Sequence, residues 1–164
     1  MAVTEGLSSP LVGRDGDVAR AQALIDRLPE EGGALLVAGP PGIGKSALLQ
    51  QVQRHAAERG IETLATEGVE SEAELAFAGL HQLLRPIRNH VEGLPAPQRR
   101  ALEAAFGITG EDEPDPFLVA LAAYELVISA TSAAPLLLVA DDAHWLDRSS
   151  VGVLTFIADR KSVV

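Results

Sequence analysis

The fold follows most directly from Ala34-Leu35-Leu36-Val37-Ala38-Gly39-Pro40-Pro41-Gly42-Ile43-Gly44-Lys45-Ser46. Its first part, residues 34–38, is a continuous apolar run, which is typical of a parallel strand buried on both faces. A turn rich in glycine and proline follows, and the apolar spacing after it predicts a helix from about Lys45 to Arg59. Strands that alternate with helices in this way predict an α/β fold with a parallel sheet.

The turn Gly39–Ser46 matches the phosphate-loop pattern G-x-x-x-x-G-K-[ST] in full. Glycines let the backbone wrap tightly around an anion, and the positive N-terminus of the following helix points at the same anion. Lys45 supplies a charge to the β- and γ-phosphates, and the Ser46 hydroxyl is a ligand for Mg²⁺. The predicted nucleotide-binding residues are Gly39, Pro40, Pro41, Gly42, Ile43, Gly44, Lys45, Ser46 and Ala47. The alternative is a glycine-proline turn that ends in Lys-Ser by chance.

A second apolar run, residues 136–140, predicts another buried strand, and it ends in Asp141-Asp142. This is the Walker B arrangement, in which a strand delivers a carboxylate beside the phosphate loop. We assign a magnesium contact to Asp141. Asp142 is the candidate catalytic carboxylate that orients or polarises the attacking water, acting with Lys45. The alternative for Asp142 is a residue that starts a turn, where aspartate is common.

The remaining elements are predicted from apolar spacing and from capping residues. Asp15 or Asp17 is expected to cap the first helix, and Asp147 the last. A weaker strand is predicted at residues 61–66. Residues 1–10 are expected to be a flexible tail and residues 11–164 one domain. Helices are predicted at about residues 15–28, 45–59, 72–88, 97–106, 117–132 and 147–157.

Composition excludes several classes of function. The net charge is −10 and the pI about 4.8, the opposite of what a direct nucleic-acid contact rewards. The chain has no cysteine, so disulfides and zinc–thiolate sites are excluded. None of its four histidines has a zinc-type partner at helical spacing. The N-terminus lacks a basic region followed by an apolar run, and we predict a cytoplasmic protein.

Residues 117–140 carry a single charge, Glu125, and roughly 20 apolar residues can span a bilayer. However, Glu125 lies near the middle of the run, where a charge is costly, and Pro135 divides the run in two. We therefore predict a helix, a turn and a buried strand here, with no membrane contact.

Five segments in order resemble the ATPase domain of large ATP-binding LuxR-type transcriptional regulators, in the STAND branch of the AAA-like ATPases. They are Leu11–Arg14, Gly39–Ser46, Glu74–Pro86, Leu94–Leu102 and Leu138–Asp147. The resemblance implies a P-loop NTPase three-layer sandwich that binds ATP with Mg²⁺ and acts as a nucleotide switch. It also implies that Val12, Gly13 and Arg14 lie near the adenine or ribose. The alternative for Arg14 is a surface charge beside a helix start.

The resemblance also predicts a parallel sheet that is incomplete at its C-terminal side. In that family a later strand lies between the phosphate-loop strand and the Walker B strand, and no such strand is found here. Arg148 and Arg160 lie in the wrong context to serve as the γ-phosphate sensor, so we expect weak hydrolysis. DNA binding is expected only in a longer parent protein, and self-association is compatible with this class. The alternatives are a non-enzymatic remnant and a small-molecule P-loop kinase.

Overall fold

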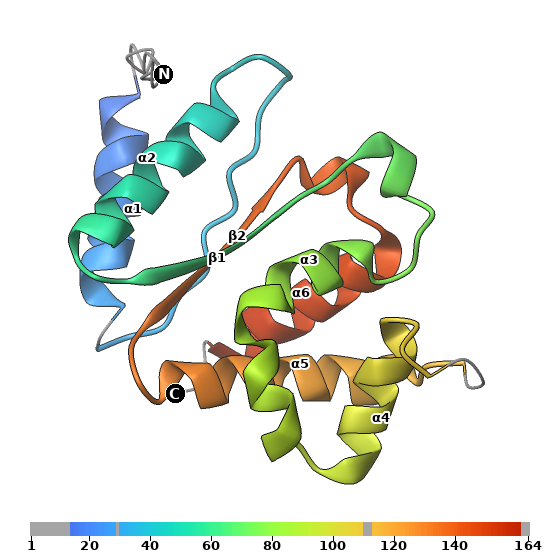
Figure 1. Ribbon diagram of the computed structural model, residues 1–164. Helices are drawn as coiled ribbons and strands as arrows, with labels where there is room; N and C mark the ends of the chain where they lie inside the picture. Colours follow the sequence, from blue (N-terminus) through green and yellow to red (C-terminus); the bar gives the residue numbers. More distant parts are fainter. Residues whose placement is uncertain (1–13, 29, 110–112, 162–164) are drawn as a thin grey trace, which may run out of the picture.

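The computed structural model describes residues 14–28, 30–109 and 113–161 (Figure 1). The predicted tail, residues 1–10, lies outside them. The helices of the described part are α1 (Asp15–Arg27), α2 (Lys45–Glu58), α3 (Ala78–Leu84), α4 (Ala96–Ala105), α5 (Pro116–Thr131) and α6 (Arg148–Lys161). The strands are β1 (Glu62–Glu67) and β2 (Leu136–Asp141), and short 3-10 helices occupy Glu70–Glu72, Arg85–Gly93 and Ala143–Trp145. The predicted mixed α/β class is confirmed.

The two strands pair in parallel, from Glu62 opposite Leu136 to Glu67 opposite Asp141. A long connection through α3, α4 and α5 makes this direction possible, because parallel strands need a crossover. Both strands therefore end at the same edge of the sheet. Asp141 is the last residue of β2 and lies at that edge, where ligands of open α/β sheets bind.

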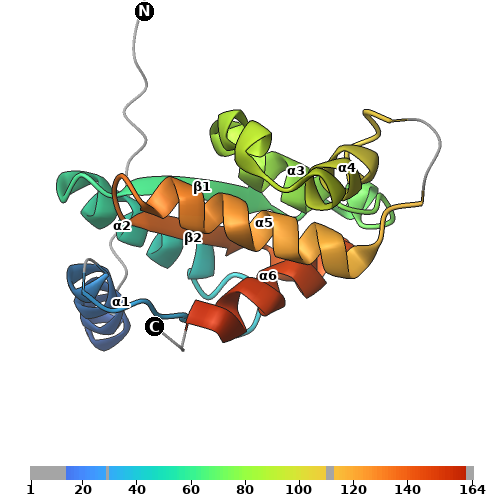
Figure 2. The ribbon, with the colours of Figure 1, turned by 90° about the horizontal axis from the view of Figure 1, so that it is seen from below.

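Two apolar clusters cover opposite faces of this small sheet. Figure 2 shows the helices that contribute residues to them. Successive side chains of a strand point to opposite faces. Leu136 and Leu138 accordingly belong with the larger cluster, which includes residues of α3, α4, α5 and α6, whereas Leu137 packs against the smaller cluster formed by α1 and α2. Burial on both faces explains why β2 reads as a continuous apolar run.

The strand predicted at residues 34–38 is wrong: the segment runs beside the sheet without joining it (Figure 1). Among the described residues, no hydrogen bond between two backbone groups joins residues 33–39 to another segment. A groove of about 890 Å³ is lined by this segment on one side and by β2 on the other. A strand needs a neighbour about 4.8 Å away, and here the groove takes that place. Leu36 is consequently 88% exposed, and Val37 alone of the run packs against the smaller cluster.

The helix predicted at residues 72–88 is also corrected, because it is divided into a 3-10 turn, α3 and a second 3-10 segment. Phe77 interrupts it with a left-handed backbone, φ 64°. Pro86, which cannot donate a backbone hydrogen bond, lies at the start of the 3-10 segment that follows α3. Leu75 is 57% exposed, whereas Leu80, Leu83, Leu84 and Ile87 are buried.

The predicted N-terminal capping is wrong for the first helix and confirmed for the last. Arg14 is the N-cap of α1 and no side chain caps it, so the predicted capping by Asp15 or Asp17 is wrong. Both aspartates lie in the first turn, where their charge favours the helix dipole. Asp147, at the start of α6, does accept a hydrogen bond from the Ser150 N–H at 2.9 Å, as predicted.

The apolar run 117–140 divides as predicted, into α5 and β2 with a turn between them. No helix within the described ranges is both long enough and apolar enough to cross a membrane.

Candidate functional site

The loop before α2 has the backbone that its glycines predict. Gly42 and Gly44 have φ values of 76° and 88°, in the region that favours glycine. A Cβ added to Gly42 would meet no atom within 4 Å, so this glycine serves the backbone conformation rather than the packing. Gly44 is the N-cap of α2 and makes no side-chain capping bond. The first N–H groups of α2 are therefore not occupied by a capping side chain, as an anion site at a helix N-terminus requires.

The ammonium group of Lys45 is held over its own loop. Its Nζ donates to the carbonyl oxygens of Gly39 at 3.1 Å and Pro40 at 3.2 Å. An ammonium group has three protons, so one remains for a ligand. Lys45 also lines the large groove beside β2. The positive charge thus lies where the loop, the first turn of α2 and the groove meet.

The acidic end of β2 opens into the same groove. Asp141 and Asp142 are half-buried, and both line the groove together with Gly39, Pro41 and Lys45. The structure therefore places parts of both motifs along one groove, although the sequence separates them by about a hundred residues, whereas Ser46 is not among the residues that line it. Asp142 has a left-handed backbone, φ 44° and ψ 45°, and its N–H donates to Asp141 Oδ1 at 2.8 Å.

The residues present fit a magnesium nucleotide. Within the described ranges, no group of three or more His, Cys, Asp or Glu side chains could hold a metal by itself. Magnesium at phosphate sites does not need one, because one or two protein groups, phosphate oxygens and waters complete its shell. A hydroxyl at Ser46 and a carboxylate at Asp141 are oxygen donors of that kind.

Gly68 allows the backbone after β2 to pass close to the end of β1. Its N–H donates to the Asp141 carbonyl at 2.9 Å, which extends the ladder by one residue. Gly68 is buried, and a Cβ there would overlap the Asp142 carbonyl oxygen and lie 2.7 Å from the Leu146 nitrogen. No sequence pattern indicated this contact.

Asp147 and Ser150 join the start of α6 to the start of α3. Asp147 is 3% exposed and accepts hydrogen bonds from the N–H groups of Phe77 at 2.8 Å and Gly79 at 3.2 Å. Ser150 is fully buried, and its Oγ accepts from the Leu80 N–H at 2.7 Å. Burial by itself would raise the pKa of Asp147. The Ser150 hydroxyl and the N–H groups of Ser150, Phe77 and Gly79 outweigh burial and hold that pKa below its ordinary value.

We expect the stability of the chain to fall in acid through Asp147. Its folded pKa is lowered, so its contribution is complete above the unfolded value of about 4 and is lost as the pH falls through the folded pKa. Urea unfolding between about pH 7 and pH 3 measures this. Asp147→Asn has no carboxylate to titrate, so its stability should depend less on pH below about pH 4. Equal slopes in the two proteins would contradict the assignment.

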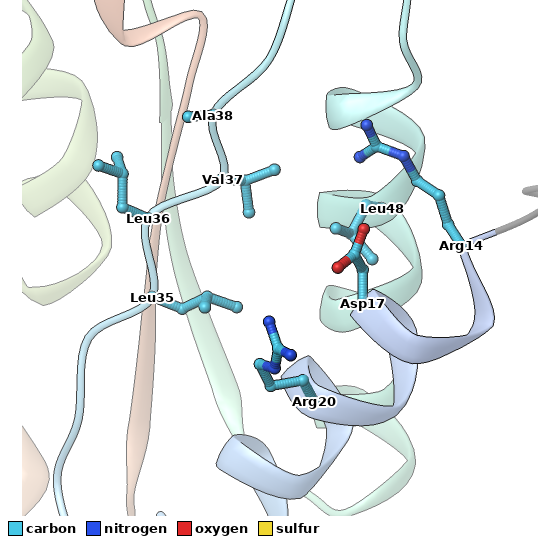
Figure 3. Close-up of a pocket in the computed structure, with 8 residues that line it drawn as sticks. All are labelled: Arg14, Asp17, Arg20, Leu35, Leu36, Val37, Ala38 and Leu48. Atoms are coloured by element: carbon cyan, nitrogen blue, oxygen red, sulfur yellow. The ribbon is translucent and has the colours of Figure 1, made fainter.

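Arg14 lies beside the phosphate loop. A Cβ on Gly39 would be 3.9 Å from Nη2 of Arg14, and Arg14, Asp17 and Arg20 of the α1 region face residues 35–38 across a cavity of about 130 Å³ (Figure 3). Val12 and Gly13, predicted to flank the adenine or ribose with Arg14, lie outside the described residues. The role of Arg14 remains a prediction.

His144 and Trp145 are surface residues. The His144 side chain is 63% exposed, and its Nδ1 lies 3.9 Å from Asp142 Oδ1. Its ring stacks obliquely on Trp145, with centroids 5.1 Å apart.

The family of the chain is shown by comparison with family models. The model described as "AAA ATPase domain" matches residues 10–163. Neither the curated proteins nor the solved structures gave a match. The match spans nearly the whole sequence, including both the phosphate loop and the acidic end of β2, so this chain belongs to the AAA ATPase domain family.

Proposed function

We propose that this chain binds ATP with Mg²⁺ as the nucleotide-switch domain of a transcriptional regulator of the LuxR type. One observation carries the nucleotide part: Gly39, Pro41 and Lys45 line the same groove as Asp141 and Asp142. A positive loop and a carboxylate pair at one strand edge match the needs of a triphosphate and its metal. Membership of the AAA ATPase domain family also supports nucleotide binding.

Each residue has a part in this proposal. The backbone of Gly39–Ala47 encloses the phosphates, and Lys45 neutralises the β- and γ-phosphates. Ser46 and Asp141 hold the magnesium ion, which stabilises charge on the phosphate oxygens. Asp142 orients the attacking water, and Val12, Gly13 and Arg14 contact the adenine or ribose.

We propose that hydrolysis is weak. An arginine near the γ-phosphate can be worth orders of magnitude in rate. The guanidinium of Arg160 instead lies over the Phe156 ring, 3.4 Å from its centroid. Arg148 is exposed at the start of α6 and is absent from the residues that line the groove. Neither arginine supplies charge to the phosphates, which favours a switch over a fast enzyme.

The regulatory part of the proposal rests on the five segments named above. It treats residues 11–164 as one ATPase domain of a cytoplasmic regulator. The charge of −10 argues that this domain does not itself contact DNA, so DNA binding would belong to another part of a longer protein. Contact between copies of the domain is compatible with a switch of this kind.

A non-enzymatic remnant is the second candidate. The two-stranded sheet and the exposed segment 34–38 favour it, because two strands alone are marginally stable. The two candidate functions differ in whether Mg-ATP stabilises the folded state.

Thermal unfolding with and without Mg-ATP distinguishes them. A ligand that binds only the folded state at a hundredfold excess over its Kd adds about 2.7 kcal/mol. We expect a cooperative transition that Mg-ATP moves to higher temperature, and Mg-GTP serves as the comparison for the base. A chain that melts without cooperativity, or that ignores Mg-ATP, would support the remnant.

We expect Asp141→Ala to reduce the effect of magnesium more than the contact with bare nucleotide. The matched control is Glu67→Ala. Glu67 is the register partner of Asp141 at the end of β1, and its substitution by alanine removes the same charge. Calorimetric titration of ATP in Mg²⁺ and in EDTA measures the ratio of the two affinities. An unchanged ratio in Asp141→Ala would remove this carboxylate from the metal shell.

A further inference from the structure

We propose that Asp147 and Ser150 are positioning residues for the magnesium end of the site. They form a clamp, the Asp147–Ser150 clamp, which fixes the loop of residues 142–146. The clamp thereby fixes the Asp142 N–H, which donates to Oδ1 of Asp141, the proposed magnesium ligand, at 2.8 Å. The inference rests on the proposed function and deepens it, because it names what holds the acidic end of β2 in place.

The bonds of the clamp join segments that are far apart in the sequence. Phe77 and Gly79 donate to the Asp147 carboxylate, and Leu80 donates to the Ser150 hydroxyl, across 68 to 70 residues. Hydrogen bonds to an ionised acceptor are the stronger kind. Asp147 immediately follows the 142–146 loop, so whatever fixes Asp147 also fixes the C-terminal end of that loop.

Two glycines leave the loop little freedom between its ends. The space at Gly68 is filled by the Asp142 carbonyl and the Trp145 and Leu146 backbone. A Cβ on Gly79 would lie 2.6 Å from Leu146 Cδ2 and 3.3 Å from Ser150 Oγ. The loop is therefore packed between the end of β1 and the start of α3, with the clamp at its C-terminal end.

The packing of the loop affects the site through the backbone conformation of Asp142. Its left-handed conformation is uncommon for a residue with a side chain, and such conformations persist where the surroundings over-determine them. Local bonds contribute, since the Trp145 N–H donates to the Asp142 carbonyl at 2.8 Å. The clamp and Gly68 supply the contacts from outside the loop. Without the clamp, we expect the Asp142 backbone to relax and its N–H to release Asp141 Oδ1, so that the Asp141 carboxylate loses its orientation toward the metal.

If the clamp only stabilised the contact with α3, its loss would leave the magnesium affinity of the site unchanged. The two roles differ in the ratio of ATP affinity with Mg²⁺ to ATP affinity in EDTA. Loss of stability alone does not move this ratio in molecules that are still folded. Loss of a group that orients metal ligands typically costs 10- to 100-fold in metal affinity.

The test compares Asp147→Asn and Ser150→Ala with Leu102→Ala, a core change in α4 at a residue 1% exposed. ATP titrations are made below the melting temperature of all variants. We expect the magnesium ratio to fall about tenfold in Asp147→Asn, less in Ser150→Ala, and not in Leu102→Ala. Ser150→Ala removes the acceptor for the Leu80 N–H and the hydroxyl bond to Asp147 but keeps the carboxylate, and it serves if Asp147→Asn does not fold.

Amide hydrogen exchange of the nucleotide-free chain gives a second readout. Loss of the clamp should speed exchange in residues 77–80 and 142–146 by about tenfold or more and leave α1 and α2 at the parental rates. If the parent protein binds ATP equally well with Mg²⁺ and in EDTA, the proposed function and this inference are both wrong. The parent protein could instead bind ATP more tightly with Mg²⁺ than in EDTA. If Asp147→Asn then keeps both this affinity ratio and the parental exchange rates, this inference alone is wrong.

Discussion

Replacing Lys45 by alanine is expected to remove most of the affinity for a nucleoside triphosphate. The ammonium group lies at the meeting point of the phosphate loop and the groove, held by the carbonyls of Gly39 and Pro40. Truncating one partner of a hydrogen-bonded charge pair costs about 2–5 kcal/mol, and 3 kcal/mol corresponds to a loss of roughly 100-fold in affinity. Isothermal titration with Mg-ATP measures the loss directly.

The matched control for this change is Arg54→Ala. Arg54 lies on the same helix, is exposed, and lines neither of the two cavities beside the phosphate loop, yet its removal changes the net charge equally. We expect Arg54→Ala to bind Mg-ATP within about twofold of the parent, since only long-range electrostatics changes. Lys45→Ala with parental affinity would show that the phosphate-loop assignment is wrong.

Replacing Gly68 by alanine is expected to destabilise the chain by about 3 kcal/mol or more, the range for overpacking against atoms that cannot move aside. The added methyl would overlap backbone atoms of the loop after β2, not the end of a flexible side chain. For a domain of this size, such a loss lowers the melting temperature by roughly 10 °C. Thermal unfolding followed by circular dichroism measures it.

The matched control is Gly152→Ala, because the packing around Gly152 leaves room for a side chain. Gly152 is exposed in α6, and a Cβ there meets no atom within 4 Å. Alanine in a helix interior is about 0.5–1 kcal/mol better than glycine, so this variant should be slightly more stable than the parent. Similar melting temperatures for the two alanine variants would contradict the close contact at Gly68.

Sequence patterns predicted the parts of the site that depend on local structure. The phosphate loop and Lys45 are given by a continuous motif, and Asp141 follows directly from the end of an apolar strand. Residues 34–38 have the same apolar pattern as β2 but form no strand. A strand is completed by hydrogen bonds to a neighbour, and the composition of a segment contains no information about whether that neighbour is in place.

The contacts around Asp147 could not be predicted for a related reason. Spacing indicated a helix cap, which is a bond over three residues, and this was confirmed. The bonds from Phe77 and Gly79 span about 70 residues and depend on how α3 meets α6. The break of the predicted helix at Phe77 is part of the same contact, because its N–H is bound by the distant carboxylate.

The open side of β2 also bears on how the protein behaves in concentrated solution. A sheet edge with free backbone groups is a template for association, and here the exposed Leu35 and Leu36 lie across the groove from it. At neutral pH the charge of −10 keeps molecules apart. That repulsion vanishes near the pI of about 4.8, so colloidal stability should be lost there, at a pH where the Asp147–Ser150 clamp is still intact. Light scattering should therefore rise before the fold is lost, which makes mildly acidic buffers unsuitable for storage and purification.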